Sequence, residues 1–155
     1  MLTESLPKIE DAIQIREIAA TDAEAAAQLC AELGYPVEAE PMRERIDELS
    51  DAKGRVVYVA CVSNMVIGWI EVSIVRHLSS GASGEIGGFI VSSGYRGGGI
   101  GRQLIAQAEQ WVAYKGAAKM VVRSRITREA AHRFYFREGY SITKTSAVFS
   151  KQLKA

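Results

Sequence analysis

The first third of the chain changes from the hydrophobic period of a strand to that of a helix. Ala12–Ile18 alternates apolar and polar residues, which predicts a strand. An alanine-rich stretch follows and stops at Gly34, where Pro36 prevents a helix from continuing. Glu38–Leu49 then places its apolar side chains on one face and its charges on the other. We therefore expect one strand and two helices in this part of the chain.

The middle of the chain has the two-residue period of strands. Arg55–Val62 and Met65–Val75 flank a Ser-Asn pair, which predicts a hairpin with a tight turn. Arg76–Gly84 is polar and rich in serine and glycine, so it predicts a loop. The apolar run Glu85–Val91 predicts the next strand.

The last third returns to alternating helices and strands. A helix is expected from the end of a glycine-rich run to about Lys115, followed by a short buried strand at Lys119–Arg123. Another helix should begin at Thr127 and end at Gly139. Tyr140–Leu153 alternates weakly and predicts a closing pair of strands. This order of elements favours an α/β (α+β) fold, with one mixed sheet and helices on both of its faces.

Length and composition favour one globular domain. The chain has 155 residues, of which 48% are hydrophobic and 24% are charged, and this is enough to bury a core. We expect residues 1–10 to form a loose arm and residues 11–155 to form a single domain. No run of about 18 apolar residues and no basic-then-apolar leader is present, so we expect a soluble, cytoplasmic protein without membrane contact.

Charge and cysteine usage exclude several classes of partner. The net charge of +1 argues against a general nucleic-acid binder, which needs a strongly basic surface. Cys30 and Cys61 fit a reducing compartment and are expected to pack as small apolar residues. His77 and His132 have no metal-ligand spacing with the cysteines, so no metal is expected.

A glycine-rich turn between a strand and a helix is the clearest chemical signal. Arg96-Gly-Gly-Gly-Ile-Gly101 leaves the backbone bare, so its amide groups can approach a phosphate at the positive end of the helix that follows. A P-loop would need a lysine after its last glycine, and Ile100 stands there instead. A dinucleotide fingerprint would need a third glycine where Arg102 stands. The turn therefore predicts a phosphate cradle of another kind.

Two motifs closely resemble those of the GNAT superfamily of N-acetyltransferases. Tyr95–Gly101, with the helix that follows, resembles the acyl-CoA-binding motif of the family, and Ala131–Tyr140 resembles its Ala-x-x-Phe-Tyr-x-x-x-Gly-Phe/Tyr segment. The resemblance implies a mixed, mostly antiparallel sheet flanked by about four helices. It also implies an acyl-CoA-dependent N-acyltransferase that uses acetyl-CoA as co-substrate and an amine as acceptor.

The resemblance implies how the donor is bound. The CoA pyrophosphate should sit on the backbone amides of the glycine turn, and the pantetheine arm should lie along the preceding strand as an added strand. At least one of Arg96 and Arg102 should contact phosphate, although each can also be a solvated charge. The implied cofactor-binding residues are Phe89, Ile90, Val91, Arg96, Gly97, Gly98, Gly99, Ile100, Gly101 and Arg102.

The resemblance also implies direct attack of the amine on the thioester in a ternary complex, without a covalent acyl-enzyme. Tyr135 is the candidate proton donor to the leaving thiolate, and its alternative is a packed core aromatic. Glu85 and Glu71 are the candidate bases, and water alone is a third possibility. Many relatives carry a glutamate in the middle of the motif strand, where this chain has Gly87.

The sequence does not decide between an enzyme and a binding domain, and it does not identify the acceptor. A catalytically inactive acyl-CoA-binding sensor or interaction domain is the alternative to an enzyme, because the base is uncertain. The acceptor is open among small amines, free amino acids and the amino groups of proteins or peptides. Arg76–Gly84 and the first two helices should line its site. A homodimer is implied by resemblance only, with the closing strands as its possible contact.

Overall fold

The computed structural model of the protein describes residues 12–154. The chain divides into two compact units, Met1–Val122 and Arg123–Ala155. The loose arm expected at residues 1–10 lies outside the described residues, and the single domain expected over residues 11–155 stays a prediction.

The first unit contains a five-stranded sheet whose strands lie in the order of the sequence. The strands are β1 (Ile13–Glu17), β2 (Arg55–Val62), β3 (Met65–His77), β4 (Gly81–Val91) and β5 (Met120–Val122). β1 to β4 pair antiparallel, whereas β5 runs parallel to β4. The expected mixed, mostly antiparallel sheet is therefore confirmed, and β2 begins and ends at the predicted residues.

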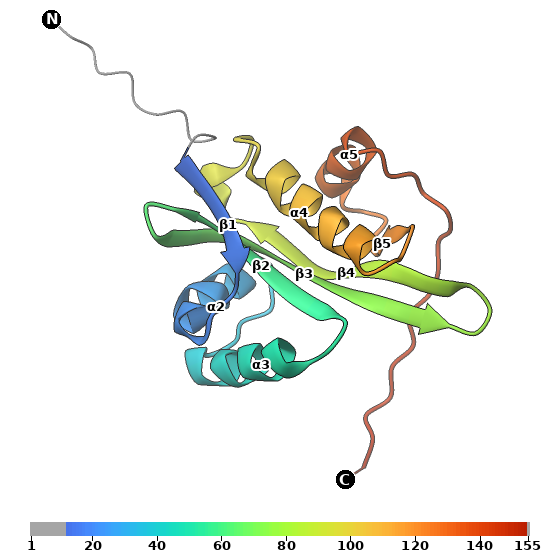
Figure 1. Cartoon of the computed structure of the whole chain (residues 1–155), viewed down its shortest axis with the longest axis horizontal. Coiled ribbons are helices and arrows are strands. Elements are labelled where there is room, and N and C mark those ends of the chain that lie inside the picture. Colours follow the sequence, from blue (N-terminus) through green and yellow to red (C-terminus); the bar gives the residue numbers. More distant parts are fainter. Residues whose placement is uncertain (1–11, 155) are drawn as a thin grey trace, which may run out of the picture. The chain divides into compact units, whose positions relative to one another are not determined.

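Helices cover both faces of this sheet (Figure 1). The helices are α2 (Ala23–Glu32) and α3 (Ala39–Asp51) on one face and α4 (Ile100–Tyr114) on the other. The small residues of α2 pack with Met42 and Ile46 of α3 in one buried cluster. On the opposite face, Leu104 and Ile105 of α4 are almost completely buried. Each helix thus buries the apolar stripe that its sequence predicts.

A charged pair fixes the junction between β1 and α2. Arg16 donates from Nη1 and Nη2 to the two carboxylate oxygens of Asp22, at 2.7 and 2.9 Å. The N–H group of Ala19 donates to Asp22 Oδ2 at 2.7 Å, which closes the short 3-10 turn η1 (Ala20–Asp22). The Arg16 guanidinium holds the pKa of Asp22 below its ordinary value, although burial opposes this shift.

The structure contradicts the predicted loop at Arg76–Gly84. β3 continues to His77 and β4 already begins at Gly81, so most of the segment is a paired hairpin. Packing requires a small residue at position 84, because a Cβ at Gly84 would meet both methyl groups of Val112 in α4. Gly84 thus reflects the close approach of a helix and a strand, whereas Gly81 adopts left-handed backbone (φ +76°) at the end of the hairpin turn.

The second unit contains α5 (Glu129–Arg137), which ends before the left-handed Gly139 (φ +92°). Residues 140–154 form no strand, so the predicted closing pair of strands is wrong. A strand needs a neighbouring edge, and no described residue of the chain pairs with this segment. Its large apolar side chains are exposed instead: Ile142, Val148, Phe149 and Leu153.

Candidate active site

A glycine-rich turn connects β4 to α4. β4 ends at Val91, a 3-10 turn η2 spans Ser93–Tyr95, and Gly97 (φ +86°) and Gly99 (φ +82°) then adopt left-handed backbone. L-residues with side chains rarely adopt this conformation. Gly99 is the N-cap of α4, and its carbonyl accepts the first helical hydrogen bond from Gln103 at 3.1 Å. The N–H groups of the first helical turn therefore point toward the turn, an arrangement that is suited to binding an anion.

Two arginines flank this helix N-terminus. The side chain of Arg96 folds back on the strand, and its Nε donates to the carbonyl oxygen of Val91 at 3.1 Å. This bond fixes the exposed guanidinium beside the end of β4. Arg102 is exposed on the first turn of α4. Both side chains add positive charge where the helix dipole is already positive.

One edge of β4 is only partly covered by β5. The two strands pair through Gly84–Ile86, but β4 continues to Val91. Beyond Ile86, the sheet of the described residues has no strand on this side of β4. Phe89, Ile90 and Val91 lie in this part of the strand and pair with β3 on its other side. An uncovered strand edge can accept an extended chain as an added strand.

A β-bulge interrupts β4 where the pairing with β5 ends. Glu71 of β3 pairs with Gly88, and Val72 pairs with Ile86, so Gly87 is an extra residue in β4. Gly87 and Gly88 therefore both lie opposite Glu71.

The side chain of Glu71 fills the space that these glycines leave. A Cβ at Gly87 would lie 3.0 Å from Glu71 Oε2. A Cβ at Gly88 would lie 3.6 Å from the same oxygen and 2.6 Å from Cζ3 of Trp69. The Glu71 carboxylate thus lies over the bulge, where the uncovered edge of β4 begins.

Glu85, the other candidate base, occupies a different position. It pairs with Ser73 of β3 and with Val121 of β5, so strands cover it on both sides. Since Ser73 lies two residues after Glu71, the side chains of Glu85 and Glu71 are on the same face of the sheet. Only Glu71, however, lies over the bulge.

The C-terminal end of α2 lies beside both features. Ser93 Oγ donates to Glu32 Oε1 at 3.2 Å, which links η2 to this helix. Burial raises the pKa of the Cys30 thiol, the Arg45 guanidinium opposes this shift, and the Glu71 carboxylate adds to it. Cys30 is therefore within electrostatic reach of Glu71. The end of α2 borders the glycine turn on one side and Glu71 on the other.

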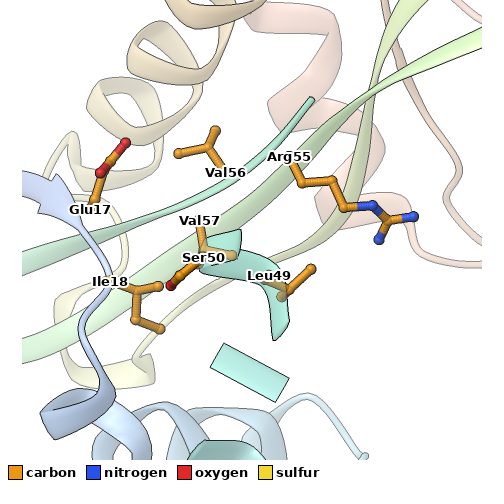
Figure 2. A pocket seen from close by; sticks show the side chains of 7 residues that line it. All are labelled: Glu17, Ile18, Leu49, Ser50, Arg55, Val56 and Val57. Carbon is orange, nitrogen blue, oxygen red and sulfur yellow. The ribbon is translucent and has the colours of Figure 1, made fainter. Parts of the chain in front are cut away.

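A small hollow of about 90 Å³ lies elsewhere in the first unit (Figure 2). It is lined by Glu17, Ile18, Leu49, Ser50, Arg55, Val56 and Val57. The Ser50 hydroxyl in it already donates to the carbonyl oxygen of Ile46 at 2.9 Å. None of the predicted site residues lines this hollow.

Tyr135 lies in the second unit, on α5. Its ring makes edge-to-face contacts with Phe134 and Tyr140, with centroids 5.5 and 5.8 Å apart. Burial raises the pKa of the Tyr135 phenol, and the positive charge of Arg128 opposes part of this shift. The phenol is therefore protonated at neutral pH, as a proton donor must be.

Comparison with known proteins decides the family. Residues 14–140 match the acetyltransferase (GNAT) family, which is most of the chain. The chain belongs to this family. The resemblance of the two sequence motifs is thereby confirmed, and the protein is an acyl-CoA-dependent acetyltransferase. Within residues 12–154, its five-stranded sheet with helices α2 to α5 is the predicted GNAT-like fold.

Individual GNAT proteins similar to this chain act on different amines. An aminoglycoside N(6')-acetyltransferase type 1 of Stenotrophomonas maltophilia is 29% identical over 150 residues, covering 94% of this chain and 97% of that protein. An aminoalkylphosphonate N-acetyltransferase of Salmonella typhimurium is 41% identical over 76 residues, or 48% of this chain and 49% of that protein. A solved structure of AAC(6')-Iy with a bisubstrate analogue, CoA-S-monomethyl-acetylneamine, has a TM-score of 0.81 at 20% identity and covers 91% of this chain and 99% of that chain.

In this GNAT chain, the structure brings several predicted residues together. β4, the glycine turn and the first turn of α4 form one continuous segment that carries every predicted donor-binding residue. Glu71 joins them through the bulge. Sequence reasoning missed Trp69, which lies over Gly88, because no local pattern marks a residue that meets a glycine on the next strand. Among residues 12–154, no helix is long and apolar enough to cross a membrane, and no group of three or more potential metal ligands occurs.

Proposed function

We propose that the protein transfers the acetyl group of acetyl-CoA to a primary amine in a ternary complex, without a covalent acyl-enzyme and without a metal. One observation carries this proposal above the others. The uncovered edge of β4 leads directly into a turn that presents backbone N–H groups at a helix N-terminus. An extended arm that ends in a pyrophosphate can bind along the edge of β4 and place its pyrophosphate at the turn.

In the proposed complex, the donor is held mainly by backbone. Phe89, Ile90 and Val91 contribute main-chain hydrogen bonds to the pantetheine arm, and the amides of Gly97–Gly101 hold the pyrophosphate. Arg96 and Arg102 add charge-assisted hydrogen bonds to phosphate oxygens. Such backbone contacts do not depend on side-chain rotamers, so they would hold the thioester at one position along β4.

The proposed reaction needs three proton transfers, two from the acceptor nitrogen and one to the leaving sulfur. The ammonium of the acceptor loses a proton to Glu71 or Glu85, and the free amine attacks the thioester carbonyl. A C–N bond forms, the C–S bond breaks, and the second amine proton leaves to solvent. Tyr135, whose phenol is protonated at neutral pH, is the proposed proton donor to the departing thiolate. The products are an amide and CoA thiol.

The proposed acceptor is a small aliphatic amine. The two relatives are named for an aminoglycoside and an aminoalkylphosphonate, both of which carry such an amine. Glu71 and Glu85 lie on one face of the sheet, and two carboxylates attract an ammonium group. Arg76–Gly84 and the first two helices were expected to line the acceptor site. Most of Arg76–Gly84 is a paired hairpin, so we propose only α2 and α3 for this role.

Two measurements test the enzyme assignment. Calorimetric titration with acetyl-CoA should show binding, and absence of binding at millimolar ligand would refute the donor site. A thiol-release assay should then be run with aminoglycosides, aminoalkylphosphonates, polyamines, amino acids and a lysine peptide. Release above background with at least one acceptor is expected.

Binding of acetyl-CoA without thiol release would instead support the inactive sensor. That alternative rested on the uncertain base and on Gly87, where many relatives carry a glutamate. Here the Glu71 carboxylate lies 3.0 Å from the position of a Cβ at Gly87, so a carboxylate does occupy this space. The enzyme is therefore the reading that we favour.

We also propose that the protein is a cytoplasmic homodimer. Its two cysteines are free thiols, as in a reducing compartment.

The exposed C-terminal segment supports the dimer. Val148 and Phe149 are 86% and 93% exposed, and a second copy of the chain is the simplest surface to cover them. Light scattering should give a dimer for the protein and for Lys151→Gln, but a monomer for Phe149→Asp. A monomeric wild-type protein at every concentration would refute the dimer.

A further inference from the structure

We propose that Trp69 is a positioning residue for Glu71, and that the paired glycines of the β4 bulge exist to admit these two side chains. This assigns to Glu71, rather than to Glu85, the proton that the amine loses. The inference rests on the proposed function, since it concerns the base of that reaction. Trp69 has no part in the donor site described above.

The bulge provides a slot shaped for two side chains. Trp69 and Glu71 are two residues apart in β3 and so lie on the same face of the sheet. A Cβ at Gly87 would approach the Glu71 carboxylate, and a Cβ at Gly88 would lie 2.6 and 2.8 Å from Cζ3 and Cη2 of Trp69. Any larger residue at position 88 would displace the indole. Two glycines at the bulge therefore let both side chains lie flat across β4.

The indole ring restricts where the carboxylate can lie. A Cβ at Gly88 would lie within contact distance both of the outer edge of the indole and of Glu71 Oε2. The edge of an aromatic ring carries partial positive charge, so it favours a carboxylate beside it. Holding Glu71 in one rotamer places its oxygens at the start of the uncovered edge of β4.

The ring itself is held by packing rather than by a hydrogen bond. Trp69 packs against the buried cluster of α2 and α3 that contains Met42 and Ile46. Its Nε1 is buried and has no hydrogen-bond partner among the described residues. A buried N–H group without a partner destabilises the folded state by about 1–3 kcal/mol. Hydrogen bonding by Nε1 therefore gives no reason for a tryptophan at this position. What the larger ring adds is its outer edge beside Glu71.

The test uses the two tryptophans of the chain as a matched pair. Trp69→Phe removes Cζ3 and Cη2 and leaves a gap beside Glu71, whereas Trp111→Phe makes the same change on α4. We expect Trp69→Phe to lower kcat about tenfold while the Kd for acetyl-CoA stays within about twofold, because a small misplacement of a reacting group is costly. Trp111→Phe should leave both values unchanged. An equal loss of kcat in the two variants would overturn the proposal.

A double-mutant cycle separates positioning from general packing. Glu71→Gln should lower kcat about 100-fold or more, because a base is lost. In the Glu71→Gln background, Trp69→Phe should cause no further loss. If Trp69→Phe lowers kcat by the same factor with and without the carboxylate, Trp69 does not act through Glu71 and the proposal is wrong.

A spectroscopic measurement keeps the test independent of turnover. The 13C resonance of the Glu71 carboxyl carbon should move toward that of a freely rotating glutamate in Trp69→Phe and should not move in Trp111→Phe. No movement in either variant would refute positioning even in a protein with no identified acceptor. Failure of the thiol-release assay would instead refute the proposed function.

A rescue experiment tests the slot itself. Gly88→Ala should lower the melting temperature, because its Cβ collides with the indole. Adding Trp69→Phe removes the two atoms that collide, so the double variant should recover much of the lost stability. Recovery supports the slot, and a double variant less stable than Gly88→Ala alone would contradict it.

Discussion

Replacement of Asp22 by alanine removes the acceptor of three short hydrogen bonds at the start of α2. The Asp22 side chain is 8% exposed, and its oxygens receive two bonds from Arg16 and one from Ala19. Hydrogen bonds to charged groups contribute about 1.5–3 kcal/mol each, and breaking a buried pair costs about 3–5 kcal/mol. The Arg16 side chain is 35% exposed and can be solvated again, which lowers this cost. We expect Asp22→Ala to lower the free energy of unfolding by about 2–3 kcal/mol.

Two further variants separate charge from shape. Asp22→Asn keeps an oxygen for the N–H of Ala19 but loses the charge that holds Arg16, so about 1–2 kcal/mol should be lost. Asp47→Asn removes an exposed carboxylate of α3 and should change the free energy of unfolding by less than about 0.5 kcal/mol. Urea unfolding followed by far-UV circular dichroism at pH 7 gives the three values. In a chain of this size, Asp22→Ala should lower the melting temperature by roughly 5–10 °C.

The same pair predicts a dependence on pH. The pKa of Asp22 is lower in the folded protein than in the unfolded chain, so its contribution is complete above the unfolded pKa of about 3.9. It is lost as the pH falls through the folded pKa, where the carboxylate takes up a proton. The difference in stability between wild type and Asp22→Asn should therefore shrink toward acid pH. A difference that stays constant from pH 7 into this acid range, or no difference at pH 7, would refute the reasoning.

Three other substitutions test the donor site, the acid and the packing of α4. Gly99→Glu places a charged side chain at a left-handed position and should abolish acetyl-CoA binding by calorimetry, whereas Gly94→Ala, with open space around its Cβ position, should change the Kd by no more than about twofold. Equal affinity of the two variants would mean that the phosphates bind elsewhere. Tyr135→Phe should lower kcat by about 100-fold at unchanged Kd, and an unaltered kcat would leave Tyr135 with a packing role only. Gly84→Ala should lower the free energy of unfolding by about 1–3 kcal/mol because its Cβ meets Val112, and an unchanged urea midpoint would contradict that contact.

Local patterns predicted the parts of this fold that local chemistry decides. The glycine turn is one of them, because left-handed backbone at Gly97 and Gly99 needs glycine wherever the chain goes afterwards. The limits of β2 are another, since its apolar run ends where a tight turn begins. That turn uses the left-handed Ser63 and Asn64.

Long-range packing decided the parts that were predicted wrongly. The residues before Glu85 suggested a loop, but Gly84 is small because Val112 lies directly above it, and Val112 is far away in the sequence. The C-terminal segment alternates apolar and polar residues as a strand does. Alternation alone, however, does not provide a neighbouring strand with which the segment could pair. Period alone therefore distinguishes a strand from a helix, but it does not establish that a strand forms.

The choice between the two candidate bases depends on how β3 pairs with β4, and the sequence does not show this register. Glu71 was one of two candidates on neighbouring strands, and a shift of one residue would have put either on the other face. The single extra residue at Gly87 places Glu71 over the bulge and leaves Glu85 between two strands.

The bulge also has a consequence for the length of this segment. Gly84 and Ile86, before the bulge, face α4, and the extra residue shifts the alternation so that Ile90 lies opposite Trp69 on the other face. Deleting either glycine would make Ile90 change faces and would exchange the N–H and C=O groups that β4 presents along its uncovered edge. Residues 78–80 at the tip of the β3–β4 hairpin carry no such constraint. Insertions and deletions among functional relatives should therefore collect at the tip and be absent from the bulge.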